Sequence, residues 1–90
     1  MVNYRTKYTG VTGTGLVLAG EGWLSSFFLN SVDSGTIAIY DALSATGTAV
    51  HTIAPTVLGN YAMDNEHFTT GCCVAITGTA NVTFRTIEIG

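Results

Sequence analysis

The sequence has little charge and almost no proline. Only 10% of its 90 residues are charged and one is proline, while 47% are hydrophobic. The formal net charge is −3 at pH 7, with three Lys or Arg side chains in the whole chain. Proteins that bind nucleic acid present several cations on one face, so this composition argues against nucleic acid as a partner. A surface this poor in charge tolerates contact with neighbouring copies, and we expect self-association.

Long apolar runs and helical periodicity are also missing. No uninterrupted apolar stretch approaches the ~20 residues of a membrane helix or the ~7–15 residues of a signal-peptide core. We therefore expect no membrane partner and no signal peptide. No window repeats apolar residues every three to four positions over ten residues, which excludes a substantial amphipathic helix.

What the sequence does contain is short segments of alternating apolar and polar residues, separated by turn-forming residues. This pattern is typical of β-strands, and its spacing fits a β-sandwich, a jelly roll or a small barrel. We predict one all-β domain over residues 1–90, an antiparallel, jelly-roll-like β-sandwich of about eight short strands. The predicted strands are 2–9, 16–19, 23–32, 36–41, 48–54, 58–64, 72–77 and 81–89.

Two pairs of these strands are predicted to be joined by tight turns. Ser34-Gly35 would close a hairpin between 23–32 and 36–41, and residues 78–80 would join 72–77 to 81–89. The residues of the first strand, 2–9, alternate in the manner of a half-buried strand. The apolar phase of the last strand changes near Arg85, which predicts a bulge there or burial on both faces.

The segment 23–32 is apolar on both faces. Alternation cannot place the neighbours Phe27 and Phe28 in one core, so we expect one of them to lie at a contact between subunits. Trp23, Phe27 and Phe28 are therefore the candidate subunit-interface residues.

The run Asp64-Asn65-Glu66-His67 is the strongest candidate for a metal site or a catalytic site, with His51 as a further ligand. A contiguous polar run between strands is more often a solvated loop, and we assign no metal, no cofactor and no catalytic residue. No serine stands in a G-x-S-x-G elbow, so we expect no enzyme. A hydrolase or metalloprotein would require His51, His67 and Asp64 to lie within ligand distance of one another.

Two other features have structural interpretations. Residues 10–15 have the glycine density of a phosphate-binding loop, but no Lys-Ser/Thr follows and the next element is a strand, so we interpret them as a turn. Cys72 and Cys73 are sequence neighbours, which point to opposite faces in a strand and cannot form a bridge without a strained turn. We expect two reduced, buried thiols and a reducing compartment at synthesis.

The middle of the chain resembles small β-rich virion proteins of tailed bacteriophages, which are head-decoration, head-fibre or tail-associated modules. The resemblance is carried by four stretches: an apolar strand over 22–31, a strand ending in Tyr-Asp over 34–41, a Ser-x-x-Gly loop at 44–47, and a Gly-x-x-Val through Gly-Thr-Ala-x-Val-Thr segment over 71–83. Together they span roughly residues 20 to 84. The resemblance implies a structural role in the virion.

Such proteins are commonly trimers that bind a capsid or tail surface. The resemblance therefore implies a non-enzymatic capsid decoration or head-fibre protein, synthesised in the host cytoplasm, whose partners are its own copies and the major capsid or another virion protein. The alternative is a carbohydrate- or receptor-binding tip module on the same fold. For that alternative we expect Tyr61 or Trp23 to act as the aromatic platform.

Overall fold

The computed structural model describes residues 3–89, without the side chains of residues 33 and 34. These residues form six antiparallel strands: β1 (Tyr4–Val11), β2 (Thr14–Leu18), β3 (Gly22–Tyr40), β4 (His51–Ile53), β5 (Gly59–Phe68) and β6 (Cys72–Ile89). The prediction of an all-β, antiparallel fold is confirmed. Within the described range there is no helix, and hence none long and apolar enough to span a membrane.

Two strands organise the sheet. β3 has 19 residues and β6 has 18, and they pair with each other along almost their whole lengths. The first half of β3 also pairs with β5, and the second half of β6 pairs with β1. The second half of β3 pairs with β4, and the first half of β6 pairs with β2. One continuous sheet therefore has four strands side by side at either end of the long pair.

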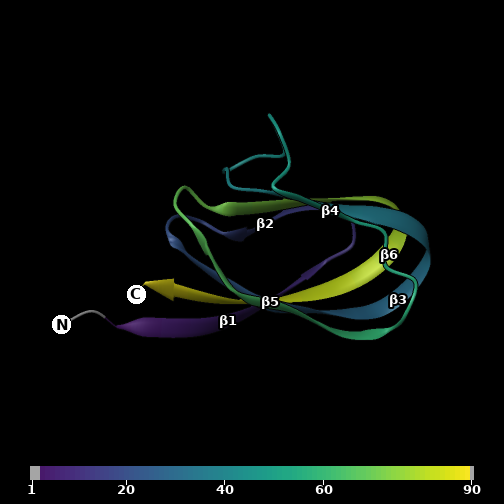
Figure 1. Ribbon diagram of the computed structural model, residues 1–90, viewed down its shortest axis with the longest axis horizontal. Helices are drawn as coiled ribbons and strands as arrows, with labels where there is room; N and C mark the ends of the chain where they lie inside the picture. Colours follow the sequence, from purple (N-terminus) through teal and green to yellow (C-terminus); the bar gives the residue numbers. More distant parts are fainter. Residues whose placement is uncertain (1–2, 90) are drawn as a thin grey trace.

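The sheet curls back on itself where β3 and β6 bend together (Figure 1). We call the part with β1, β5 and residues 22–29 of β3 the lower arm, and the part with β2, β4 and residues 35–40 of β3 the upper arm. In Figure 1, β2 and β4 lie above β1 and β5, with the bend at the right. The curl brings the inner faces of the two arms together.

The bend lies where we predicted two tight turns, and both predicted hairpins are wrong. β3 runs through Gly35 and β6 runs through Gly78, and these glycines are paired with each other. Both have a positive φ, 152° and 89°, and a Cβ atom on Gly35 would lie 2.3 Å from the carbonyl oxygen of Thr77. Glycine permits the close approach of two backbones, and it also permits the backbone geometry of a tight turn. A glycine in the sequence therefore indicates either arrangement without distinguishing them.

The core lies between the arms. Its largest fully buried side chains come from both, and Thr86 is buried among them with its hydroxyl 3.5 Å from the carbonyl oxygens of Lys7 and Val17. Because Val17 belongs to β2, this group links the lower arm to the upper one. The other large buried side chains are Phe27, Phe68, Phe84, Leu18, Leu24, Leu29, Ile37, Ile39, Val17, Val74 and Val82.

The first strand also differs from its prediction. Residues 4–8 of β1 are exposed on both faces, and Val11 is its buried residue. The alternation of Tyr4, Thr6 and Tyr8 predicted a half-buried strand. β1 pairs with β6 along one side and ends the order of strands, so residues 4–8 lie at an edge of the sheet.

The irregularity predicted near Arg85 lies in the neighbouring strand. β6 pairs with β1 without interruption through Arg85, whereas the register between β3 and β6 shifts at Ser25. In β6 the inward alternation of Val82 and Phe84 continues to Thr86. The apparent change of phase arises because Ile87, on the other face, is also apolar.

Candidate functional site

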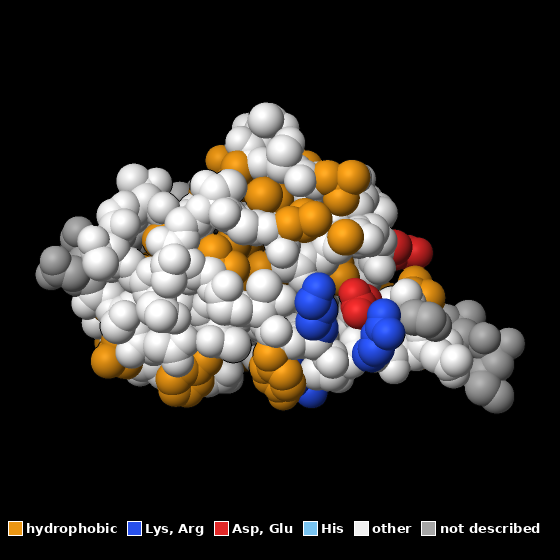
Figure 2. Space-filling view, turned by 180° about the vertical axis from the view of Figure 1, so that it is seen from behind, with side chains coloured by type: hydrophobic (Ala, Val, Ile, Leu, Met, Phe, Trp, Pro, Cys, Tyr) orange, Lys and Arg blue, Asp and Glu red, His pale blue; other side chains and the backbone are white. Residues whose placement is uncertain are grey.

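The outer face of the lower arm, which we call the lower outer face, carries side chains from β1, β3, β5 and β6. Directly paired residues share a face, and the pairs Trp23 with Ile87, Ser26 with Arg85 and Phe28 with Thr83 point away from the core. Of the side chains on this face, Tyr4 is 61% exposed, Tyr8 66% and Phe28 48%. Figure 2 shows hydrophobic side chains gathered in separate groups on the surface.

The structure separates the three candidate interface residues. Phe27 is 1% exposed and stacks on Tyr61, with ring centroids 4.8 Å apart, and it also contacts Phe84. It belongs to the core and offers no surface to a partner. Trp23 and Phe28 both lie on the lower outer face, as expected if one phenylalanine leaves the core.

One end of this face is apolar. Tyr4, Trp23, Asn65 and Ile87 line a shallow hollow of about 240 Å³. The Trp23 ring meets Tyr4 edge-on with a centroid distance of 5.5 Å, and its other neighbour is the His67 ring at 5.4 Å. The hollow therefore has aromatic rings from β1 and β3 already packed against each other, with Tyr4 exposed and Trp23 half-buried.

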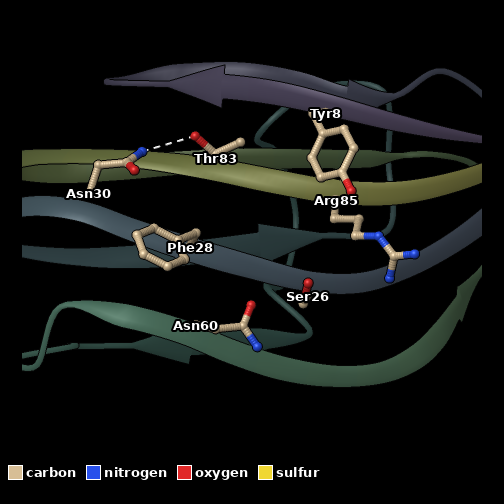
Figure 3. A pocket seen from close by; sticks show the side chains of 7 residues that line it. All are labelled: Tyr8, Ser26, Phe28, Asn30, Asn60, Thr83 and Arg85. Atoms are coloured by element: carbon tan, nitrogen blue, oxygen red, sulfur yellow. Dashed lines mark hydrogen bonds between the residues drawn. The ribbon is translucent and has the colours of Figure 1, made fainter.

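The other end of the face is a groove of about 360 Å³ with mixed chemistry, shown in Figure 3. Four strands contribute its lining: β1, β3, β5 and β6. The lining residues are Tyr8, Ser26, Phe28, Asn30, Asn60, Thr83 and Arg85.

Hydrogen bonds hold two of the polar side chains of the groove in place. The Asn30 amide nitrogen donates to Thr83 Oγ1 at 2.9 Å and to Asn81 Oδ1 at 3.2 Å. Arg85 Nη1 donates to Ser25 Oγ at 2.8 Å. The Ser25 hydroxyl is available because the register shift in β3 turns both Ser25 and Ser26 toward this side. The groove thus presents an oriented amide beside Phe28 and an oriented guanidinium beside Tyr8.

No carboxylate among the described side chains pairs with Arg85. The described residues form an ion pair between Arg5 and Glu88 and two histidine–carboxylate contacts, His51 with Glu66 and His67 with Glu21. None of them involves Arg85, and the residues that line the groove include no carboxylate. In a chain of net charge −3, the groove is a locally positive site.

The predicted polar loop at Asp64–His67 is instead part of β5. Asp64 and Asn65 have φ of 56° and 52°, and residues 63–65 form a bulge opposite Ser25. Successive side chains of a strand point to opposite faces, so Glu66 and His67 separate. Glu66 Oε1 lies 2.5 Å from His51 Nε2, and His67 Nε2 lies 2.7 Å from Glu21 Oε2.

His51, His67 and Asp64 are therefore not brought together. Among the described side chains, which exclude those of residues 33 and 34, no three or more His, Cys, Asp or Glu lie in a group that could hold a metal ion. The geometry that we required for a hydrolase or metalloprotein is not formed by these residues.

The two cysteines are free and buried, as predicted. Burial raises the pKa of the Cys72 thiol to about 12, with smaller contributions from Cys73, Asp41 and Glu66, and burial also raises the pKa of Cys73. Both thiols are therefore protonated at neutral pH and are poor nucleophiles.

Asp41 stabilises the turn that joins β5 to β6. Its carboxylate accepts hydrogen bonds from the backbone N–H groups of Thr69, Thr70 and Gly71 and from the Thr69 hydroxyl. Burial favours a higher pKa for this carboxyl group, but the hydrogen bonds outweigh it and the pKa is lowered.

The sequence pattern did not indicate most of the residues that line the groove. Tyr61, one expected aromatic platform, lies on the inner side against Phe27 and donates its hydroxyl to the Val57 carbonyl oxygen at 2.6 Å. Tyr8 and Phe28 occupy the groove instead. The signal for Tyr8 was present in the alternation of residues 4–8, but the sequence does not show that this strand is exposed.

Comparison of the chain with models of protein families, with curated proteins and with solved structures finds no match.

Proposed function

We propose that the protein is a non-enzymatic structural protein of a bacteriophage virion, of the capsid decoration or head-fibre type, and that it acts by oligomeric surface binding. In this proposal the curled sheet is a β-sandwich of jelly-roll type, since its two arms enclose one core. The lower outer face supports the proposal, because Phe28 is exposed there and Trp23 lies half-buried beside further aromatic residues.

The physical argument concerns this face and the low charge of the chain. Interface cores are enriched in aromatic side chains and depleted of charge. The apolar end around Tyr4, Trp23 and Ile87 has this composition, and contact there would remove apolar surface from water. A decoration protein stabilises a shell by binding the assembled lattice better than free subunits, which requires such a surface and no catalytic cleft. We propose a homotrimer with a capsid or other virion protein as its partner.

The oligomeric state tests the first half of the proposal. Size-exclusion chromatography with light scattering should give a trimer mass across micromolar concentrations for the native chain, and Trp23→Ser should shift the population toward monomer. Leu43→Ser is the matched control, because Leu43 is 58% exposed but lies outside the described strands. A clean monomer for the native chain would contradict the proposal.

The virion half is tested on particles. Mass spectrometry of purified phage particles from the source genome should detect the chain at a fixed ratio to the major capsid protein. Electron microscopy of particles with and without it should locate the added density. Its absence from the particles would contradict a virion role.

The second candidate function is carbohydrate binding on the same fold. It is favoured by the groove, where exposed aromatic rings lie beside amide and guanidinium groups. Pockets that recognise polar ligands combine an apolar wall with a few placed polar groups, and this groove has both.

A further inference from the structure

The groove on the lower outer face differs from the apolar end of that face in its charge and its hydrogen-bonding groups. We propose that it is a binding site for an acidic saccharide, a pyranose ring that carries a carboxylate, with Arg85 as the group that recognises the acid. This inference rests on the second candidate function and adds the class of ligand and the residue that selects it.

The aromatic rings set the position of the sugar ring. Tyr8 is on β1 and Phe28 is on β3, and β6 runs between these strands. Neighbouring strands are about 4.8 Å apart, and Tyr8 pairs with Arg85 whereas Phe28 pairs with Thr83, two residues further along β6. The two side chains therefore rise about 12 Å from each other, diagonally across β6. Figure 3 shows both rings projecting from the sheet with the polar side chains between and beside them. A sugar ring offers C–H groups that pack on such amphipathic walls.

The side-chain amides of Asn30 and Asn60 supply hydrogen-bond partners for the hydroxyl groups of the sugar. The nitrogen of Asn30 is already donated to Thr83 and Asn81, which orients the side chain and leaves its carbonyl oxygen as an acceptor. Asn60, on β5, makes no side-chain hydrogen bond to any of residues 3–89 in this structure, and it is exposed. One acceptor and one complete amide therefore face a ligand whose hydroxyls both donate and accept.

Arg85 supplies the selectivity. Its guanidinium group has five N–H donors, and one nitrogen, Nη1, is bonded to Ser25. No carboxylate of the described residues pairs with it, which leaves its charge open to a ligand. A carboxylate binds a guanidinium group through two parallel hydrogen bonds, which a neutral hydroxymethyl group cannot reproduce. The unbalanced cation favours an acidic sugar over a neutral one.

The test compares two ligands that differ only at this group. Methyl β-D-glucuronide and methyl β-D-glucoside are titrated into the full chain, and binding is followed by amide chemical shifts and by calorimetry. We expect the glucuronide to bind about tenfold more tightly and to shift the amides of Tyr8, Phe28 and Arg85, since a charged bidentate pair is stronger than a neutral one.

Matched variants locate the effect. Arg85→Gln should reduce the affinity for glucuronide to that for glucoside, whereas Arg5→Gln, which makes the same change in net charge at a residue paired with Glu88, should leave the difference intact. Tyr8→Ala should weaken binding of both sugars, and Leu43→Ala, at a similarly exposed apolar residue outside the described strands, should weaken neither. The amide spectrum of each variant reports whether it is folded.

The outcomes separate the two levels of the proposal. Equal affinity for both sugars, or no effect of Arg85→Gln, would overturn acid recognition and leave carbohydrate binding in place. No binding of either sugar by the folded native chain would overturn both. Equal effects of Leu43→Ala and Tyr8→Ala would show that the sugar does not occupy the groove.

Discussion

The two faces of the strand pair β3 and β6 in the lower arm differ sharply although they share one backbone. On the inner face Leu24, Phe27 and Leu29 have almost no exposed surface. On the outer face Trp23 is half-buried and Phe28 is 48% exposed. Both faces carry large apolar side chains, so apolar content does not distinguish them. The distinction comes from the upper arm, which folds over one face and leaves the other open.

The largest expected difference between the faces concerns the neighbouring phenylalanines. Phe27→Ala should lower the free energy of unfolding by about 3–5 kcal/mol, because it removes a ring packed between Tyr61 and Phe84. Phe28→Ala should lower it by less than about 1 kcal/mol, because that ring is half in solvent. Urea unfolding at one fixed protein concentration measures both values. Similar losses for the two variants would mean that the outer face is as well covered as the inner one.

The adjacent cysteines extend the comparison to the upper arm, where both side chains are buried although they point to opposite faces. Because burial raises the pKa of Cys72 from 9.0 to about 12, its thiolate fraction at pH 8 falls about a thousandfold. We expect Cys72 and Cys73 to react with a thiol reagent such as DTNB only as fast as the protein opens. Reaction in urea should be rapid and gives the control. Rapid labelling of one thiol in the native protein would show that its face is open.

The smallest of the three effects concerns Asp41, which connects the end of β3 to the turn between β5 and β6. Asp41→Asn should cost about 1–2 kcal/mol at pH 7, since hydrogen bonds to a charged group are stronger and this carboxyl group is partly exposed. Asp41→Ala, which removes every acceptor, should cost at least as much. Thermal or urea unfolding at matched pH values measures these losses.

The pH dependence of this effect follows from the lowered pKa of Asp41. The folded-state pKa lies below the ordinary value of 3.8, so the carboxylate stabilises the fold fully above that value and the contribution is lost as pH falls through the folded-state pKa. The difference between the native chain and Asp41→Asn should therefore be constant from pH 5 to pH 7 and shrink below about pH 4. A difference that does not change down to pH 2 would mean that the charge of Asp41 does not contribute.

The candidate site was only partly predictable. The sequence shows that Phe27 and Phe28 cannot share a core, and the structure places them on opposite faces. It does not show which one faces out, because that depends on the position of the bulge at Ser25. Tyr8 and Arg85 meet Phe28 only through the pairing of β1 and β3 with β6, a contact between distant parts of the chain. Local alternation contains no information about that pairing.

The amino-acid sequence alone determined that the chain forms strands, that they are antiparallel and that both cysteines are buried. Those properties follow from alternation, glycine spacing and hydrophobicity, all of which act over a few residues. Only the tertiary structure decided that Gly35 and Gly78 bend two long strands together instead of closing two hairpins, and that the bend covers one face of the lower arm. The reason is that a glycine permits several backbone geometries, and the choice among them depends on what packs across from it.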